Sequence, residues 1–169
     1  MQAIPFDPDD EPPPTGNTPD QLHLLKILEK KVLWLSTWMI HHANHIREGD
    51  GELKVGGHQA SCASMVTIMT ALYFAVLKPE DRVAVKPHGS PVFHAIQYLF
   101  GKQDKEHLAR FRALGGAQSY PSRTKDIDDV DFSTGSVGLG VAMTSFAALI
   151  QDYLEAHSWR KYRSRMVCV

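Results

Sequence analysis

Apolar residues recur at helical spacing along most of the chain, and short apolar runs separate the helical stretches. Thr18-Pro19-Asp20-Gln21 combines a capping threonine, an early proline and a glutamine three positions after the threonine, which predicts a helix start. From there apolar residues fall three or four positions apart, so the first helix is expected to run to about Ile46. Glycines between residues 47 and 57 then predict a loop.

The rest of the chain alternates helical patterns with two short apolar strands. Helices are predicted over residues 59–77, 90–100, 105–113 and 137–157, and strands over residues 82–86 and 166–169. Residues 114–134 form a long polar connection, and loops of that length in compact domains are typically functional or disordered. This order predicts an α/β fold with a mainly parallel sheet flanked by helices, incomplete at the C-terminus.

The first 17 residues differ in composition from the rest. They are rich in proline, aspartate and glutamate, with Pro12-Pro13-Pro14 near the centre. Such a segment buries too little apolar surface to offset the entropy of ordering it. Residues 1–17 are therefore predicted to be a disordered arm, with docking to a partner as the alternative, and residues 18–169 to form one partial domain.

Composition restricts the function classes. A net charge of -1 gives no electrostatic argument for a nucleic-acid partner or an anionic membrane. No uninterrupted apolar run reaches the roughly 18 residues that span a bilayer, and the N-terminus does not have the pattern of a secretory signal. Cys62 and Cys168 are far apart, which argues against a disulfide framework or a zinc site and makes a cytoplasmic location the expectation.

Two histidines beside glycines are candidate ligand-binding residues. His58 follows Gly56-Gly57 at a predicted helix start, with Ser61 one turn into that helix. His88 lies two residues beyond the predicted strand that ends at Lys86, and ligands of parallel sheets bind outside the carboxyl ends of the strands. Imidazoles and helix N-termini both donate hydrogen bonds to anions, so a phosphate-bearing ligand is indicated. The alternative for each histidine is a bond to its own loop backbone.

Other patterns indicate less specific roles. The segment Gly135-Ser136-Val137-Gly138-Leu139-Gly140 has neither the spacing of a dinucleotide fingerprint nor the end of a P-loop. A close helix–helix contact is its favoured interpretation, and backbone against a flat ring is the alternative. His41, His42 and His45 lack the glutamate of a zinc-protease helix, so a solvated or capped face is expected. The aspartates between residues 126 and 131 lack the glycine and glutamate of a calcium loop, so a polar loop is expected.

Four motifs in a fixed order resemble a known group of enzymes. Gly-Gly-His, His-Gly-Ser-Pro, Ser-Tyr-Pro and Ser-Thr-Gly-Ser-Val-Gly-Leu-Gly resemble the N-terminal, cofactor-binding domain of thiamine-diphosphate enzymes. The transketolase and homodimeric-type pyruvate dehydrogenase branch is the most similar, over about residues 20–169. The resemblance implies that His58 and His88 are catalytic and face the cofactor. It also implies cofactor contacts from His58, Ser61, His88, Tyr120, Gly135 and Val137.

The resemblance also implies groups that these 169 residues do not contain. In the family, a strand such as Arg165–Val169 leads into a Gly-Asp-Gly loop that holds Mg²⁺, and a downstream domain supplies an activating glutamate across a dimer interface. We therefore expect an N-terminal fragment, inactive alone, whose partner is the remainder of the enzyme or a second subunit, with the full-length family forming homo-oligomers. The alternative is a non-catalytic interaction protein, or a truncated gene product, that pairs with a partner chain. Ketose phosphates and 2-oxo acids both remain open as substrates.

Overall fold

The computed structural model describes residues 18–47, 54–159 and 163–169, so the predicted arm over residues 1–17 lies outside the described residues. The elements follow one another as α1 (Pro19–His41), η1 (His42–Ile46), α2 (Gln59–Ala71), η2 (Leu72–Val76), β1 (Arg82–Ala84), η3 (Pro87–Gly89), α3 (Ser90–Leu99), α4 (Lys105–Ala109), α5 (Leu139–Ala156) and β2 (Met166–Cys168). The described chain is therefore mostly helical, with one small sheet.

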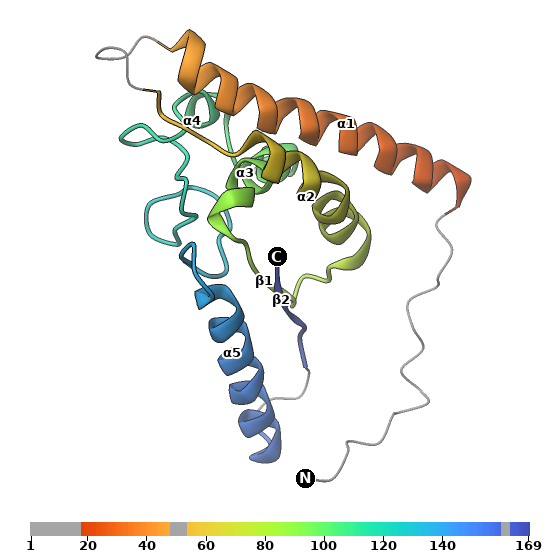
Figure 1. Cartoon of the computed structure of the whole chain (residues 1–169). Helices are drawn as coiled ribbons and strands as arrows, with labels where there is room; N and C mark the ends of the chain where they lie inside the picture. The colour runs from red at the N-terminus through yellow and green to blue at the C-terminus, as the bar shows by residue number, and fades with distance from the viewer. Residues whose placement is uncertain (1–17, 48–53, 160–162) are drawn as a thin grey trace.

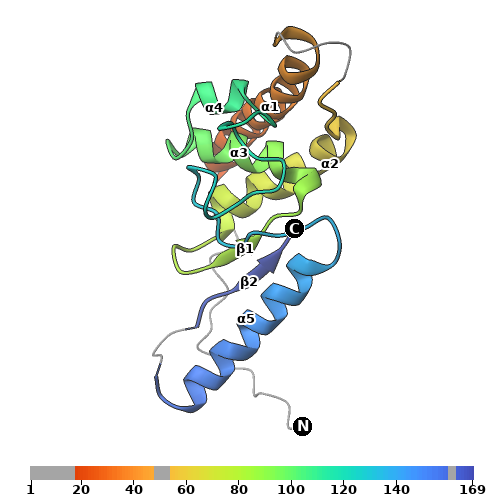
Figure 2. The same cartoon turned by 90° about the vertical axis from the view of Figure 1, so that its left-hand side faces the viewer.

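The two strands form a parallel pair, with Val83 opposite Val167. Figures 1 and 2 show α5 on one side of this pair and the helices α1 to α4 on the other. A parallel pair with helices on both sides is compatible with the predicted α/β class. Because the strands are parallel, their carboxyl ends meet at the same end of the sheet, just before His88 and at Val169.

Several predicted boundaries shift in the structure. The first helix begins as expected, since the Thr18 amide donates to Gln21 Oε1 at 2.8 Å and the Gln21 amide donates to Thr18 Oγ1 at 3.3 Å. Its last turn is a π-helix, η1, and the helix predicted over residues 59–77 likewise ends in the π-helix η2. The predicted strand over residues 82–86 is shorter, since β1 ends at Ala84.

The helix predicted over residues 90–100 begins at Ser90, as expected. Gly89 occupies its N-cap position, and Ser90 lies fully buried in the first turn. The 3₁₀ turn Pro87–Gly89 runs directly into α3. The helix predicted over residues 105–113, however, ends early, at Ala109, shortly before Arg112 takes a positive φ of 62°.

The main core lies where α1, α2 and α3 pack together. Each helix contributes side chains that are almost completely buried: Val32 and Met39 from α1, Cys62, Val66 and Met69 from α2, and Val92, Ala95 and Ile96 from α3. Burying a large apolar side chain stabilises the fold by roughly 1.5–3 kcal/mol. The core therefore fixes α2 and α3, the two helices that begin next to His58 and His88.

The outer edge of β1 is closed by side chains of the segment before α5. The Val83 amide donates to Asp131 Oδ2 at 2.8 Å, and Thr134 Oγ1 donates to the Val85 carbonyl at 2.8 Å. Burial raises the pKa of Asp131, an effect larger than the lowering by the Val83 amide and by the nearby guanidinium of Arg82. Two polar side chains thus replace a neighbouring strand along this edge.

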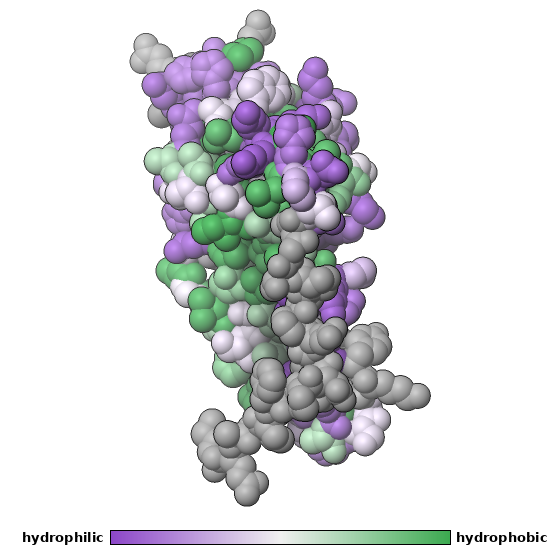
Figure 3. Space-filling model, turned by 90° about the vertical axis from the view of Figure 1, so that its right-hand side faces the viewer, coloured by the Kyte–Doolittle hydropathy of each residue, from purple (hydrophilic) through white to green (hydrophobic). Residues whose placement is uncertain are grey.

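Two helices expose large apolar side chains. On α1 these are Leu22, Leu24, Ile27, Leu33 and Trp34, and on α5 they are Leu139, Val141, Phe146, Leu149, Ile150 and Tyr153. Figure 3 shows apolar residues gathered near the middle of one face of the molecule.

The 18-residue window Gln59–Val76 has the length and mean hydropathy, 1.4, of a membrane-crossing helix, with 22% of the window buried. Core helices of soluble proteins meet the same two criteria, so this window is weak evidence for a membrane span.

Candidate functional site

The two predicted histidines meet at the carboxyl end of β1. His58 stands at the N-cap position of α2, and His88 lies in the turn η3 that follows the strand. Their ring centroids are 4.6 Å apart, with the rings edge to face. His88 Nδ1 is buried and has no hydrogen-bond partner among the residues that the structure describes. This nitrogen therefore does not make the loop-backbone bond that was the alternative for His88.

His88 separates two cavities. The first is lined by Gly57, His58, Pro87, His88, Pro91, Phe111, Arg112, Ser119 and Tyr120. The second, of about 380 Å³, is lined by Ser61, Ser64, Met65, Met69, Val85, Lys86, His88, Gly89 and Val169. Three other predicted site residues, His58, Ser61 and Tyr120, thus each line a cavity that His88 also lines.

Gly135 and Val137 lie apart from these cavities. Neither residue lines the first or the second cavity, and the Val137 side chain is 76% exposed. The favoured interpretation of their segment was a helix–helix contact, and the close contact that the structure shows there is between a helix and the sheet. A Cβ on Gly140 would lie 3.1 Å from Cys168 Sγ and 3.5 Å from Ala84 Cβ, so this glycine lets α5 pack closely on the strands.

Cys62 is hydrogen-bonded to the backbone of His88, a contact that the sequence did not indicate. Its thiol donates to the His88 carbonyl at 3.3 Å, and the side chain is 1% exposed. Burial raises the pKa of this thiol to about 12. Cys62 therefore remains a neutral hydrogen-bond donor at physiological pH, whereas Cys168 is exposed.

The two cysteines are expected to differ in reactivity. Because the thiolate is the nucleophile, iodoacetamide at neutral pH should modify Cys168 in the folded protein and leave Cys62 unmodified. Peptide mass spectrometry after limited alkylation measures both sites, and alkylation in denaturant is the control in which both cysteines react. Equal modification of the two cysteines in the folded protein would contradict the burial of Cys62.

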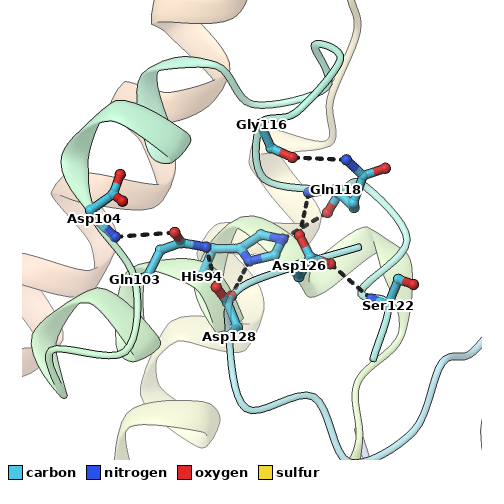
Figure 4. A network of polar contacts seen from close by, with 8 residues as sticks. All are labelled: His94, Gln103, Asp104, Gly116, Gln118, Ser122, Asp126 and Asp128. Carbon is cyan, nitrogen blue, oxygen red and sulfur yellow. Dashed lines mark hydrogen bonds and ion pairs between the residues drawn. The ribbon is translucent and has the colours of Figure 1, made fainter. Parts of the chain in front are cut away.

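A buried polar network joins α3 to the loop that carries Ser119 and Tyr120 (Figure 4). His94, on α3, is fully buried, and its Nδ1 is hydrogen-bonded to Asp128 while its Nε2 is 2.7 Å from the Gln118 carbonyl oxygen. The Gln103 amide donates to the other oxygen of Asp128. Burial lowers the pKa of His94, but the bond and charge of Asp128 and the Gln118 carbonyl outweigh it, so the pKa is raised.

The aspartates of this loop have individual structural roles. Asp126 accepts the amides of Gln118 and Ser122 at 2.9 and 2.8 Å, and Asp129 pairs with Lys102 at 3.3 Å. Among the residues that the structure describes, no group of three or more His, Cys, Asp or Glu is placed to hold a metal ion. The carboxylates of this loop thus bind groups of the protein itself, next to Ser119 and Tyr120.

The chain is similar to proteins that are named pyruvate dehydrogenase E1 component or transketolase-like protein. It is 30% identical over 134 residues to a pyruvate dehydrogenase E1 component of Mycolicibacterium smegmatis, covering 73% of this chain and 14% of that protein. It is 29% identical over 150 residues to a pyruvate dehydrogenase E1 component of Pseudomonas aeruginosa, covering 83% and 16%. It is also 29% identical over 117 residues to transketolase-like protein 2 of Mus musculus, covering 63% and 18%. No protein-family model matches the chain.

These similarities support the thiamine-diphosphate enzyme family, which the sequence motifs had indicated. The chain spans only 14–18% of the length of these three relatives. The similarity therefore concerns a partial region of those proteins. Because it covers 73–83% of this chain, any continuous region of that length includes the motifs of His58 and His88. Activity, substrate and partners of a whole enzyme are separate questions.

Proposed function

We propose that the described residues form one part of a thiamine-diphosphate site in an enzyme of the transketolase or pyruvate dehydrogenase type. The observation that carries the proposal is the 4.6 Å approach of the His58 and His88 rings at the carboxyl end of β1. Ligands of parallel sheets bind at this end. The motif order and the similarity to pyruvate dehydrogenase E1 components add independent support.

The donors around His88 suit a diphosphate. His88 Nδ1 is buried and finds no partner within the described ranges, so a ligand atom can satisfy it. The N-cap residue of α2, His58, makes no side-chain capping bond in the described structure, so the first-turn amides and Ser61 are suited to an anion. Lys86 adds a cation to the second cavity. We propose that Ser61, Tyr120 and the two histidines contact the cofactor.

The proposed chemistry divides between cofactor and protein. When bound, thiamine diphosphate supplies a carbon nucleophile that adds to the carbonyl group of a ketose or 2-oxo acid. His58 and His88 would donate hydrogen bonds to developing oxyanions and move protons, because each imidazole carries a nitrogen that can donate and one that can accept. We keep Gly135 and Val137 as proposed backbone contacts of the cofactor ring, although Val137 is largely exposed here.

Other parts of the proposal concern the whole enzyme. A Mg²⁺ ion, a homo-oligomeric assembly, a cytoplasmic location and the lack of nucleic-acid or membrane partners are proposed from the family resemblance and the composition. The described residues contain no cluster that fits the metal, so no step here depends on it. Absence of catalytic turnover by the 169 residues alone stays a prediction, tested with pyruvate and an artificial electron acceptor and with ketol transfer.

Cofactor binding is the direct test. Isothermal titration of the chain with thiamine diphosphate, with and without Mg²⁺, should show binding, and His88→Ala should weaken the affinity about tenfold or more. The exposed residue His23 on α1 provides the control His23→Ala, which should bind like wild type. No binding by the wild-type chain, or equal binding by His88→Ala, would contradict the proposed site.

A second candidate function rests on the exposed apolar faces of α1 and α5. Exposed apolar patches are typical of interaction sites, and these two helices expose several large apolar side chains. We propose, as the alternative, a non-catalytic chain that pairs with a partner, such as the remainder of the enzyme or a second subunit. Analytical ultracentrifugation distinguishes the two proposals when combined with the titration, because a chain that associates but binds no cofactor supports only the alternative.

A further inference from the structure

The backbone leading into His58 is held by side chains from two distant parts of the chain. Residues 55–57 precede His58 and belong to no helix or strand. A segment of this kind is normally variable in position, since its amides and carbonyls have no regular partners. Here Asn44 and Arg112 supply those partners.

Asn44, in the π-helix η1, binds Gly56 through both ends of its amide. Its Nδ2 donates to the Gly56 carbonyl at 3.0 Å, and the Gly56 amide donates to Asn44 Oδ1 at 2.9 Å. Asn44 Nδ2 also donates to the Ile40 carbonyl at 2.7 Å, which fixes the side chain against its own helix. The amide therefore pairs with Gly56 as the backbone of a neighbouring strand would.

Arg112 also contacts this segment. Its Nη1 donates to the Val55 carbonyl at 2.7 Å, and a Cβ on Gly56 would lie 3.0 Å from the same nitrogen. Arg112 has a φ of 62°, a conformation that is unusual for a residue with a side chain and that often marks functional sites. Arg47 stabilises this turn by donating to the Phe111 carbonyl at 2.8 Å.

Gly57 closes the arrangement next to His58. Its φ is 138°, and a Cβ there would lie 2.9 Å from Ile40 Cγ2, so the backbone passes directly against α1. Asn44 binds the backbone of Gly56, and Arg112 binds the backbone of Val55. These bonds restrict the backbone conformation that leads into His58. His58 then meets the His88 ring at 4.6 Å.

We propose that Asn44 and Arg112 are positioning residues that hold His58 against His88. This positioning role concerns the protein without a ligand. Its consequence for cofactor binding rests on the proposed function. Neither residue belongs to the motifs that indicated the site. Arg112 also lines the first cavity, together with both histidines.

The test measures the contact between the two rings. In the wild-type chain, NMR should show a cross-peak between the ring protons of His58 and His88. Asn44→Ala and Arg112→Asn should reduce this cross-peak to background while the amide spectrum remains that of a folded protein. Asparagine tolerates a positive φ, so Arg112→Asn removes the guanidinium with little backbone strain. Arg123→Asn, at the exposed arginine of the polar loop, is the matched control and should keep the cross-peak.

The outcomes separate this inference from the proposed function. An undiminished cross-peak in folded Asn44→Ala and Arg112→Asn overturns the positioning role, and if Asn44→Ala does not fold, Arg112→Asn decides. Loss of the cross-peak in both variants but not in Arg123→Asn supports it. Thiamine diphosphate titrations of the same proteins form a separate arm. Failure of the wild-type chain to bind would contradict the proposed function and leave the ring contact intact.

Discussion

Replacing Asp128 by alanine is expected to lower the free energy of unfolding by about 3–5 kcal/mol, the usual cost of removing one member of a buried ion pair. The side chains of Asp128 and His94 have no solvent exposure. The substitution would leave His94 Nδ1 and the Gln103 amide without their acceptor in the interior. Chemical denaturation measures the loss, and Asp129→Ala, on an exposed pair with Lys102, should change stability by only about 0–1 kcal/mol.

The same pair predicts how stability depends on pH. The pKa of His94 is raised in the folded protein above its unfolded value of about 6.5. Its contribution to stability is therefore fully present below pH of about 6.5 and is lost as the pH rises through the raised folded pKa. Denaturation at a series of pH values should show this loss in wild type and not in Asp128→Ala. A wild-type stability that is constant or rises over this interval would contradict the charged pair.

Replacing Gly116 by alanine is expected to destabilise the protein at or above the upper end of the roughly 1–3 kcal/mol that overpacking costs. A Cβ at this position would lie 1.9 Å from the Arg110 carbonyl oxygen and 2.5 Å from the Arg110 carbonyl carbon. Both are backbone atoms, so no side-chain rotation relieves the contact. The turn over residues 110–117, which carries Arg112, would have to shift.

Thermal unfolding and the alkylation of Cys62 provide the readouts for Gly116→Ala. Gly138→Ala is the control, because Gly138 has an ordinary φ of -66° and nothing lies within 4 Å of an added Cβ. We expect the control to unfold within a few degrees of wild type, and Gly116→Ala to unfold well below it. Similar unfolding temperatures for the two variants would show that the turn can open at little cost.

Local patterns predicted the elements that depend on neighbouring residues. The capping box at Thr18 follows from the side chains at its start, and the starts of β1 and β2, at Arg82 and Met166, follow from short apolar runs. The position of His88 could also be anticipated, because a parallel sheet places the loop after a strand at the edge where ligands bind. These features need no knowledge of contacts between distant segments.

The missed features all depend on such distant contacts. Cys62 contacts the His88 carbonyl across 26 positions, Asp128 meets His94 across 34, and Arg112 reaches Val55 across 57. None of these pairs has a spacing that identifies it, since any buried carboxylate or arginine would look the same in the sequence. The helix–helix contact favoured for the glycine-rich segment failed for the same reason, because the partner of Gly140 is a strand far along the chain.

The hydrogen bonds of Asp131 and Thr134 at β1 determine what can lie along the outer edge of that strand. A strand that joined the sheet beside β1 would have to break both bonds, at Val83 and at Val85. That flank is therefore bounded by the irregular segment that also carries Ser119 and Tyr120, and not by regular pairing. Substitutions in this border can reshape the space that a ligand enters next to His88 while the ladder between β1 and β2 stays unchanged.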